Sequence, residues 1–355
     1  MVRNRKVFKK TVSIVNEKST DMYESLVGDK KGFLLESYDK NYDRYTFFGM
    51  EPEEIVTSRG NALVITKADG TEEVREGNPL ERLKEYYSEF HIEKEDEELS
   101  FSGGLVGNLG YDFVRYSEVL PDNNPDEIGI ETIQMMLMTS FLMVDHVAET
   151  LTAVVLEEPS EEGREQAMEK AGQMIKKAME KKECKRNFYH DGKIIKKSDS
   201  IEEYGEKVEK IKHYIREGHV FQTVLSQRWT IETRQTGFEL YKELRELNPS
   251  PYLYYFNYGT FEVIGSSPEM IVKKQGNKVF TCPIAGTRKR GKDEAEDKRL
   301  RDELLSDEKE RAEHVMLVDL ARNDMGRISE FGTVKVTQFM EVQNYSLSLI
   351  HISEP

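Results

Sequence analysis

Residues 132–158 read TIQMMLMTSFLMVDHVAETLTAVVLEE, two long apolar runs on either side of a polar segment. Methionine, valine, leucine and threonine in runs with few charges favour buried β-strands. A short polar segment between two such runs is typical of a turn. The sequence therefore predicts two long strands joined at Asp145–Glu149, and it favours a fold built around β-sheet.

Strand patterns recur along the rest of the chain. Hairpins are predicted where two β-rich runs flank a glycine-containing turn, in residues 60–74, 253–265 and 270–282. Single strands are predicted at FQTVLSQRWTIET (221–233) and GTVKVTQFMEV (332–342). Strands that come in runs, with only a few helices between them, are typical of α+β proteins with largely antiparallel sheets.

Two segments have helical periodicity. Residues 160–183 carry one apolar stripe, which consists of Ala167, Ala171, Met174, Ile175 and Met179. A second helix is predicted to start at Ser200, because Glu203 completes a capping box, and to end at Gly218. Its expected buried face consists of Ile201, Tyr204, Val208, Ile211 and Ile215.

Composition narrows the class of protein. The chain has 355 residues and a formal net charge of −15, so a polyanionic nucleic acid is not an expected partner. Its apolar runs fall short of the roughly 18 residues that a membrane-spanning helix needs, and no signal-type segment follows the N-terminus. We expect a cytoplasmic protein. Its two cysteines, Cys184 and Cys282, are too few for a disulfide framework and too isolated for a zinc site.

The segment EKERAEHVMLVDLARND, residues 308–324, is the strongest candidate for chemistry. Asp307 and Glu310 predict a capping box, so the helix is expected to begin near Glu308. Glu310 and Glu313 lie about 60° apart on one helical face, just before the apolar run VMLVDL. Two carboxylates beside a buried turn are costly unless a cation compensates them, and Mg²⁺ prefers such ligands. The alternative is a charged first turn that favours the helix dipole.

Three neighbouring segments have compositions that suit a pocket. CPIAGTRKRG (282–291) places a glycine and a threonine between an apolar strand and a basic loop. GSSPEM (265–270) ends a strand with small residues and Glu269, and LARNDMGR (320–327) closes the helix with polar residues. Taken singly, each pattern is more often a turn or a cap than a site.

Together these segments resemble the chorismate-utilising enzymes, and within them the anthranilate synthase component I group. The resemblance rests on PIAGTRKRG, DEKERAEHVMLVDLARNDMGR and VKVTQFMEVQNYS. It extends upstream through FLLES (33–37), RYTFFGMEP (44–52), GGLVGNLGYDFVRY (103–116), FQTVLSQR (221–228), NPSPYLYYF (248–256) and IGSSPEM (264–270). It implies the two-lobed fold of that family, with largely antiparallel sheets and helices packed outside.

The resemblance also implies a reaction and its residues. Chorismate and ammonia would give anthranilate and pyruvate, with Mg²⁺ holding the ring carboxylate of chorismate. Glu313 matches the direct metal ligand and Glu310 the ligand that acts through water. Glu269 matches the acid at the departing C4 hydroxyl, while Gly286 and Thr287 match the loop that lines the substrate pocket.

Position 285 separates two activities within this family. Relatives that make 4-amino-4-deoxychorismate commonly carry a nucleophilic lysine there, whereas this chain has Ala285, whose methyl group cannot attack a substrate. The anthranilate reaction is therefore expected. Aminodeoxychorismate synthase component I is the alternative enzyme, and a non-catalytic tryptophan-binding fragment is the alternative without catalysis.

The resemblance further implies an inhibitor site for tryptophan. Its matching positions are Glu36, Ser37, Pro251, Tyr252 and Leu253. Glu36 is expected to meet the ammonium group of the ligand, while Pro251 and Leu253 flank its indole. Ammonia is expected from a separate glutamine amidotransferase subunit, anthranilate synthase component II.

The C-terminus departs from the family pattern. The family continues YSHVMH and then a long section, whereas this chain reads YSLSLIHISEP. The position of the family's functional histidine is Ile350 here, and His351 receives no role because it falls one place late on a strand. We therefore expect a C-terminally truncated and inactive chain. The expected division is an N-terminal lobe (1–157) with part of the inhibitor pocket, a helical connection (158–199) and the truncated catalytic lobe (200–355).

Overall fold

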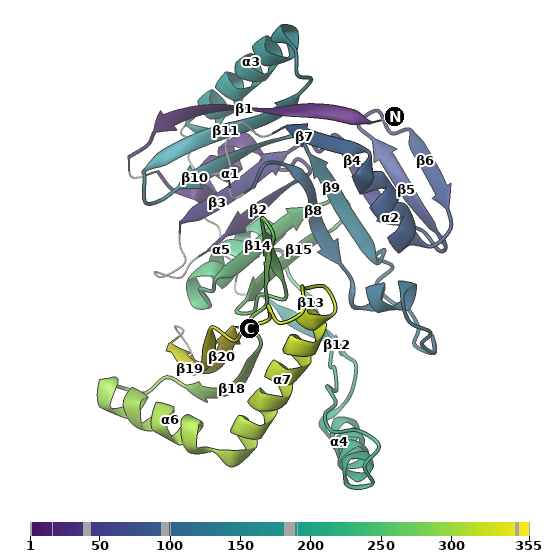
Figure 1. Cartoon of the computed structure of the whole chain (residues 1–355), viewed down its shortest axis with the longest axis vertical. Coiled ribbons are helices and arrows are strands. Elements are labelled where there is room, and N and C mark those ends of the chain that lie inside the picture. Colours follow the sequence, from purple (N-terminus) through teal and green to yellow (C-terminus); the bar gives the residue numbers. More distant parts are fainter. Residues whose placement is uncertain are drawn as a thin grey trace. The chain divides into compact units, whose positions relative to one another are not determined.

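The computed structural model describes residues 2–15, 17–37, 44–93, 99, 101–180, 189, 191–344 and 348–354. It separates into two compact units (Figure 1), the larger formed by Met1–Glu183 with Tyr241–Pro355 and the smaller by Cys184–Leu240. These bounds differ from the lobes drawn at residues 157 and 199, because strands from both halves of the chain share one sheet. Among the described residues, no helix is both long and apolar enough to cross a membrane.

The larger unit is built on an eight-stranded sheet with the order β15-β14-β2-β3-β10-β11-β1-β7. Its strands are β1 (Arg3–Ser13), β2 (Gly32–Glu36), β3 (Tyr45–Met50), β7 (Phe90–Glu93), β10 (Ser140–Asp145), β11 (Thr150–Glu157), β14 (Tyr252–Asn257) and β15 (Glu262–Ser267). Neighbouring strands run antiparallel, whereas β1 and β7 pair in parallel. The predicted hairpin at 253–265 is confirmed, and Gly259 supplies its positive φ of 90°.

A second sheet has five strands in the order β6-β5-β4-β9-β8. They are β4 (Glu54–Ser58), β5 (Ala62–Lys67), β6 (Glu72–Glu76), β8 (Gly104–Leu109) and β9 (Ile133–Met138). The hairpin predicted at 60–74 is therefore present. The first of the two long strands predicted in 132–158 is in fact two strands, because the chain leaves this sheet after Met138 and enters the eight-stranded sheet at Ser140. The predicted junction at Asp145–Glu149 is confirmed. Both pieces are predominantly apolar, so periodicity does not reveal the change of sheet.

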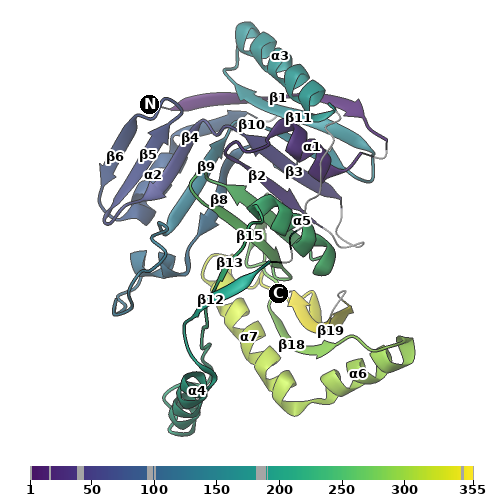
Figure 2. The same cartoon turned by 180° about the vertical axis from the view of Figure 1, so that it is seen from behind.

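The main core lies between these two sheets. Buried side chains such as Phe33, Phe141 and Phe256 from the larger sheet meet Val106 and Met136 from the smaller one. The outer face of the larger sheet is covered by α1 (Ser19–Leu26) and α3 (Glu161–Ala178), which Figure 2 shows against β1, β3 and β11. The apolar stripe predicted for α3 is buried at Ala167, Ala171, Met174 and Ile175, whereas Met179 at its end is only half-buried. The second sheet packs against α2 (Pro79–Ser88), and the 3₁₀ helix η1 (Tyr111–Tyr116) follows β8.

The last part of the larger unit contains the elements that carry the candidate catalytic residues. After the short hairpin of β16 (Lys273–Gln275) and β17 (Lys278–Phe280) come β18 (Ile284–Lys289), α6 (Glu294–Ser306), α7 (Glu308–Gly326), β19 (Gln338–Asn344) and β20 (Ser348–Glu354). The three strands form a sheet in the order β18-β20-β19, and both helices contact β18. The strand predicted at 332–342 begins only at Gln338.

The smaller unit contains β12 (Lys193–Lys197), α4 (Ile201–Arg216), β13 (Trp229–Glu232) and the start of α5 (Gly237–Leu247). The capping box of Ser200 and Glu203 is confirmed. The predicted buried face of α4 is wrong, since no residue of this helix is buried. The strand predicted at 221–233 is likewise wrong before Trp229. A single helix beside a two-stranded sheet leaves too little surface to bury an amphipathic face.

Candidate functional site

A bulge in β18 shapes the first part of the site. Ala285 pairs with His351 and Thr287 pairs with Ile350 on β20, so Gly286 is an extra residue between them. Its φ of +64° is left-handed, a conformation that glycine adopts without strain. A bulge bends its strand and changes the direction of the residues beside it. Gly286 therefore allows the strand to bulge without backbone strain. Thr287 beside it is exposed.

The first turn of α7 supplies the carboxylates. Asp307 caps the helix by accepting hydrogen bonds from the backbone N–H groups of Lys309, at 3.0 Å, and Glu310, at 3.2 Å. These bonds hold the pKa of Asp307 below its ordinary value, with the Glu310 N–H the largest cause. The helix starts at Glu308 as predicted. The expected capping box is only half formed, because the Glu310 carboxylate contacts Arg288.

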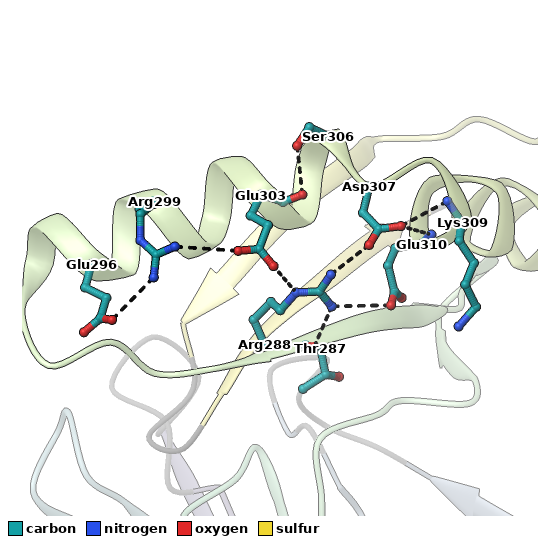
Figure 3. Close-up of polar contacts among 9 residues, drawn as sticks. All are labelled: Thr287, Arg288, Glu296, Arg299, Glu303, Ser306, Asp307, Lys309 and Glu310. Atoms are coloured by element: carbon teal, nitrogen blue, oxygen red, sulfur yellow. Dashed lines mark hydrogen bonds and ion pairs between the residues drawn. The ribbon is translucent and has the colours of Figure 1, made fainter.

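Arg288 of β18 joins this turn to α6 (Figure 3). Its Nη2 donates to Asp307 Oδ2 at 2.9 Å, its Nε to Glu303 Oε1 at 3.1 Å, and its Nη1 contacts Glu310 Oε1 at 3.4 Å. Nη1 also donates to the carbonyl oxygen of Thr287 at 3.1 Å. These contacts, led by that to Glu303, raise the pKa of the guanidinium. One cation thus holds three carboxylates against the bulged strand.

Arg288 is the residue that sequence reasoning missed. It falls within TRKRGK (287–292), a basic run that resembles solvated surface because acidic residues balance its charge. In the structure, however, only 21% of its side chain is exposed. The sequence did contain a usable signal. Arg288 follows Gly286 by two residues, just after a predicted strand, and the next predicted helix begins with the acidic residues that an arginine can pair with.

The second carboxylate, Glu313, lies one turn further along α7. Both Glu310 and Glu313 are half-buried, neither enclosed nor fully in solvent. The expected burial of the apolar run after them is only partly right. His314 and Val318, spaced by four residues, are buried, whereas Leu320 is 57% exposed. A helix that packs on one side buries only the side chains on that face, so its other apolar side chains remain exposed to solvent.

Glu269 lies apart from this network. It follows β15, its side chain is exposed, and its backbone exchanges hydrogen bonds with the Ser267 hydroxyl at 3.3 and 3.4 Å. Within the described part of the chain, it makes no hydrogen bond or ion pair with β18 or α7. The structure therefore brings together Thr287, Glu310 and the turn that carries Glu313, but it does not join Glu269 to them.

The acidic pair is the candidate for part of a magnesium site. Among the described residues, no group of three or more histidine, cysteine, aspartate or glutamate side chains is arranged to hold a metal ion. Mg²⁺ is commonly bound by one or two protein carboxylates, with waters and an anionic ligand completing its octahedron. Glu310 and Glu313 are half-buried, and they fit the requirement for one or two protein carboxylates.

The positions expected to bind an inhibitor lie at the paired ends of β2 and β14. Leu253 is the direct register partner of Glu36, so their side chains share one face of the sheet. Pro251 and Leu253 are buried, Ser37 is half-buried, and Tyr252 is 41% exposed. The structure thus brings together residues that lie more than 200 positions apart in the sequence.

Glu36 is already surrounded by donors. Its buried carboxylate accepts hydrogen bonds from Ser19 of α1, from the Tyr241 hydroxyl at 2.6 Å and from Arg245 Nε at 3.0 Å. Burial, followed by the charge of Glu36, raises the pKa of Tyr241 well above its ordinary value. A ligand ammonium would have to share Glu36 with these three donors or displace one of them. Glu36 also ties α1 and α5 to the end of β2.

A cavity of about 610 Å³ lies on the opposite face of these strands. Leu35, Tyr254 and Phe256 line it from the larger sheet, and Val106 and Asn108 line it from β8. Because side chains alternate along a strand, Ser37 is expected on the face of Leu35 and not on that of Glu36. The Ser37 hydroxyl oxygen is buried and has no hydrogen-bond partner among the described residues.

Comparisons with known proteins agree with this fold. The model of a protein family described as chorismate binding enzyme matches residues 32–354. Anthranilate synthase component 1 from Acetivibrio thermocellus is 40% identical over 327 residues, which cover 88% of this chain and 66% of the relative. The same protein from Aquifex aeolicus is 40% identical over 331 residues, with 90% and 66% covered. This chain therefore spans slightly under two thirds of their length.

A solved structure is also similar. The crystal structure of anthranilate synthase component I from Streptococcus pneumoniae superposes with a TM-score of 0.75 and 33% identity, and the match covers 88% of this chain and 68% of the other. The chain belongs to the chorismate binding enzyme family. Within that family, its similarity is to the component I proteins of anthranilate synthase.

The Asp307 cap makes a prediction about pH. Because the folded pKa of Asp307 is lowered, its stabilising contribution is complete above the unfolded value of about 3.9 and is lost as pH falls further. Asp307→Asn keeps a capping oxygen but no titrating charge, so its stability should fall less between pH 5 and pH 2.5. Urea unfolding at each pH, followed by circular dichroism, measures this. Equal slopes for both proteins would contradict the assignment.

The Glu36 cluster makes a prediction about stability. Arg245→Met leaves a buried carboxylate without its cation and should cost about 3–5 kcal/mol of unfolding free energy. Adding Glu36→Gln removes that charge, so the double variant should recover part of the loss. Chemical denaturation measures all three proteins. Arg299→Met is the control, because it breaks exposed pairs with Glu296 and Glu303 that are each worth less than about 1 kcal/mol. A double variant no more stable than Arg245→Met would exclude the coupling.

Proposed function

We propose that this chain belongs to the large subunit of anthranilate synthase, acting in the cytoplasm. In this proposal chorismate and ammonia give anthranilate and pyruvate, and a glutamine amidotransferase subunit supplies the ammonia. The observation that supports it is that Arg288 holds the acidic first turn of α7 against the bulge of β18. This geometry occurs in a chain that is 40% identical to anthranilate synthase component 1. Ala285 supports this reaction over the aminodeoxychorismate reaction, because it cannot act as a nucleophile.

The residues would divide the chemistry as follows. Glu310 and Glu313 would hold Mg²⁺, which would supply positive charge for the carboxylate of the substrate. The bulge at Gly286 would let backbone N–H groups approach the anionic substrate, and Thr287 would add a hydroxyl, so both would orient it. Arg288 keeps the turn and the strand together through its three carboxylate partners. On the resemblance, Glu269 would protonate the departing C4 hydroxyl.

An assay for anthranilate fluorescence tests the proposed reaction. The 355-residue chain is mixed with chorismate, Mg²⁺ and ammonium, in parallel with a joined chain that adds the part of the Acetivibrio thermocellus relative that it does not span. Anthranilate from the joined chain is the expected product. Formation of 4-amino-4-deoxychorismate would instead favour the alternative enzyme. Tryptophan binding with neither product would favour a non-catalytic role.

Glu313 is tested in the joined chain. Glu313→Gln keeps the shape of the side chain but removes the charge, so Mg²⁺-dependent turnover should fall by about 100-fold or more. Binding of Mg²⁺, measured by calorimetry, should weaken as well. Glu308→Gln is the matched control, because Glu308 is exposed on the first turn of the same helix. Turnover and metal affinity that match the unchanged protein would reject Glu313 as a ligand.

We further propose that tryptophan regulates the protein through the ends of β2 and β14. The cavity of about 610 Å³ is large enough for an indole, and its aromatic wall of Phe47, Tyr254 and Phe256 suits one. Ser37 and Tyr252 are expected on this face by the alternation of side chains, and both would contact the ligand there. The resemblance has Pro251 and Leu253 flank the indole and Glu36 meet the ammonium group. Glu36 and Leu253 share the face away from this cavity, so those contacts stay predictions.

Calorimetric titration with tryptophan tests this site. Ser37→Ala removes one hydrogen bond from a buried hydroxyl and should weaken binding by about fivefold. Ser117→Ala, which removes an exposed hydroxyl of the turn after η1, should leave the affinity unchanged. Glu36→Gln should weaken binding more than Ser37→Ala if the ammonium replaces Arg245. A titration with no heat of binding at millimolar tryptophan would refute the regulatory proposal.

A further inference from the structure

Three hydrogen bonds fix the guanidinium group of Arg288 in one place. Nε donates to Glu303 Oε1 at 3.1 Å, and Nη2 donates to Asp307 Oδ2 at 2.9 Å. Nη1 donates to the carbonyl oxygen of Thr287 at 3.1 Å. A guanidinium is a rigid planar fork, so bonds to all three of its nitrogens also fix the direction of its remaining donors. Arg288 is therefore anchored independently of Glu310.

A further contact of this anchored group reaches the candidate metal ligand Glu310 (Figure 3). Nη1 of Arg288 lies 3.4 Å from Glu310 Oε1, and the two side chains are 21% and 17% exposed. Within the part of the chain that the structure describes, Glu310 Oε2 makes no hydrogen bond or ion pair. The protein thus holds one oxygen of this carboxylate and leaves the other without a protein partner.

Such an arrangement has two opposite effects on a metal ion. Fixing a glutamate side chain costs conformational entropy, and a metal that had to order Glu310 itself would bind more weakly by that cost. A hydrogen bond from a neighbouring side chain orders the ligand in advance, which strengthens binding. The positive charge of Arg288, by contrast, repels a divalent cation. The direction in which a substitution changes the metal affinity therefore tells the two effects apart.

We propose that Arg288 is a positioning residue for Mg²⁺ binding. It holds Glu310 Oε1, so that Oε2 is available to the metal ion, directly or through water. This inference rests on the proposed function, in which Glu310 and Glu313 hold the metal. It gives Arg288 a role beyond joining β18 to the two helices, because Arg288 sets the metal affinity and does so through Glu310.

Calorimetric titration with Mg²⁺ alone tests this role in the 355-residue chain and, in parallel, in the joined chain. Arg288→Met removes the donors, and Mg²⁺ affinity should fall by about tenfold or more. An arginine that only repelled the metal would give the opposite result, because its removal would tighten binding. Arg290→Met is the matched control. Arg290 follows the same strand but pairs with Asp297 of α6, so its loss should change the affinity by less than about twofold.

Two more variants separate positioning from a general structural role. Arg288→Lys keeps the positive charge between the helices but cannot reproduce the fork, so the affinity should fall by about fivefold. Glu310→Gln should weaken binding, and adding Arg288→Met to it should lower the affinity by less than about twofold further. A general loosening of this turn would instead weaken binding again in the double variant, because Glu313 remains a ligand. Circular dichroism shows which variants are folded.

Three results would overturn this inference and leave the proposed metal site standing. One is an Mg²⁺ affinity that is unchanged or tighter in a folded Arg288→Met variant. Another is an unchanged affinity in Arg288→Lys, which decides the matter if Arg288→Met does not fold. The third is a full second loss when Arg288→Met is added to Glu310→Gln. Absence of saturable Mg²⁺ binding in both unchanged chains would contradict the metal site of the proposed function, and this inference with it.

Discussion

The contact of one guanidinium with three carboxylates organises the candidate catalytic region. Arg288 holds Glu303 from α6 together with Asp307 and Glu310 from the start of α7. Without that cation, these acidic groups would repel one another at the junction of the two helices. With it, the turn that carries Glu310 and Glu313 is fixed against the bulged strand β18. The proposed metal site depends on this geometry, since two carboxylates serve one cation only when they share a face.

The same principle operates at the other end of the larger unit. Glu36 gathers the Ser19 hydroxyl, the Tyr241 hydroxyl and the Arg245 guanidinium, so a buried charge is compensated by donors from two helices. These contacts seat α1 and α5 on the outer face of the sheet. The opposite face of the same strands lines the cavity between the two sheets. One strand end therefore has a structural face and a face that is open to a ligand.

Sequence patterns predicted those local elements whose formation does not depend on distant segments of the chain. The hairpins at Gly70, Gly259 and Gly276 are present because the turn residues themselves favour the left-handed backbone. The start of α7 at Glu308 and the capping box at Ser200 are equally local. The break after Met138 was not predictable, because the residues on both of its sides are apolar and the change of sheet depends on distant partners.

Of the two cysteines considered in the sequence, Cys184 lies outside the described residues.

The sequence by itself determined the α+β class, the membership of a chorismate-binding family and the position of the acidic pair near the start of α7. These properties follow from residue types at short spacings, which persist whatever the rest of the chain does. Only the tertiary structure decided that Arg288 compensates Asp307 and Glu310, and that Glu36 is engaged by Arg245. Both pairings join strands to helices across long stretches of sequence, so they depend on strand register and helix packing that no local pattern encodes.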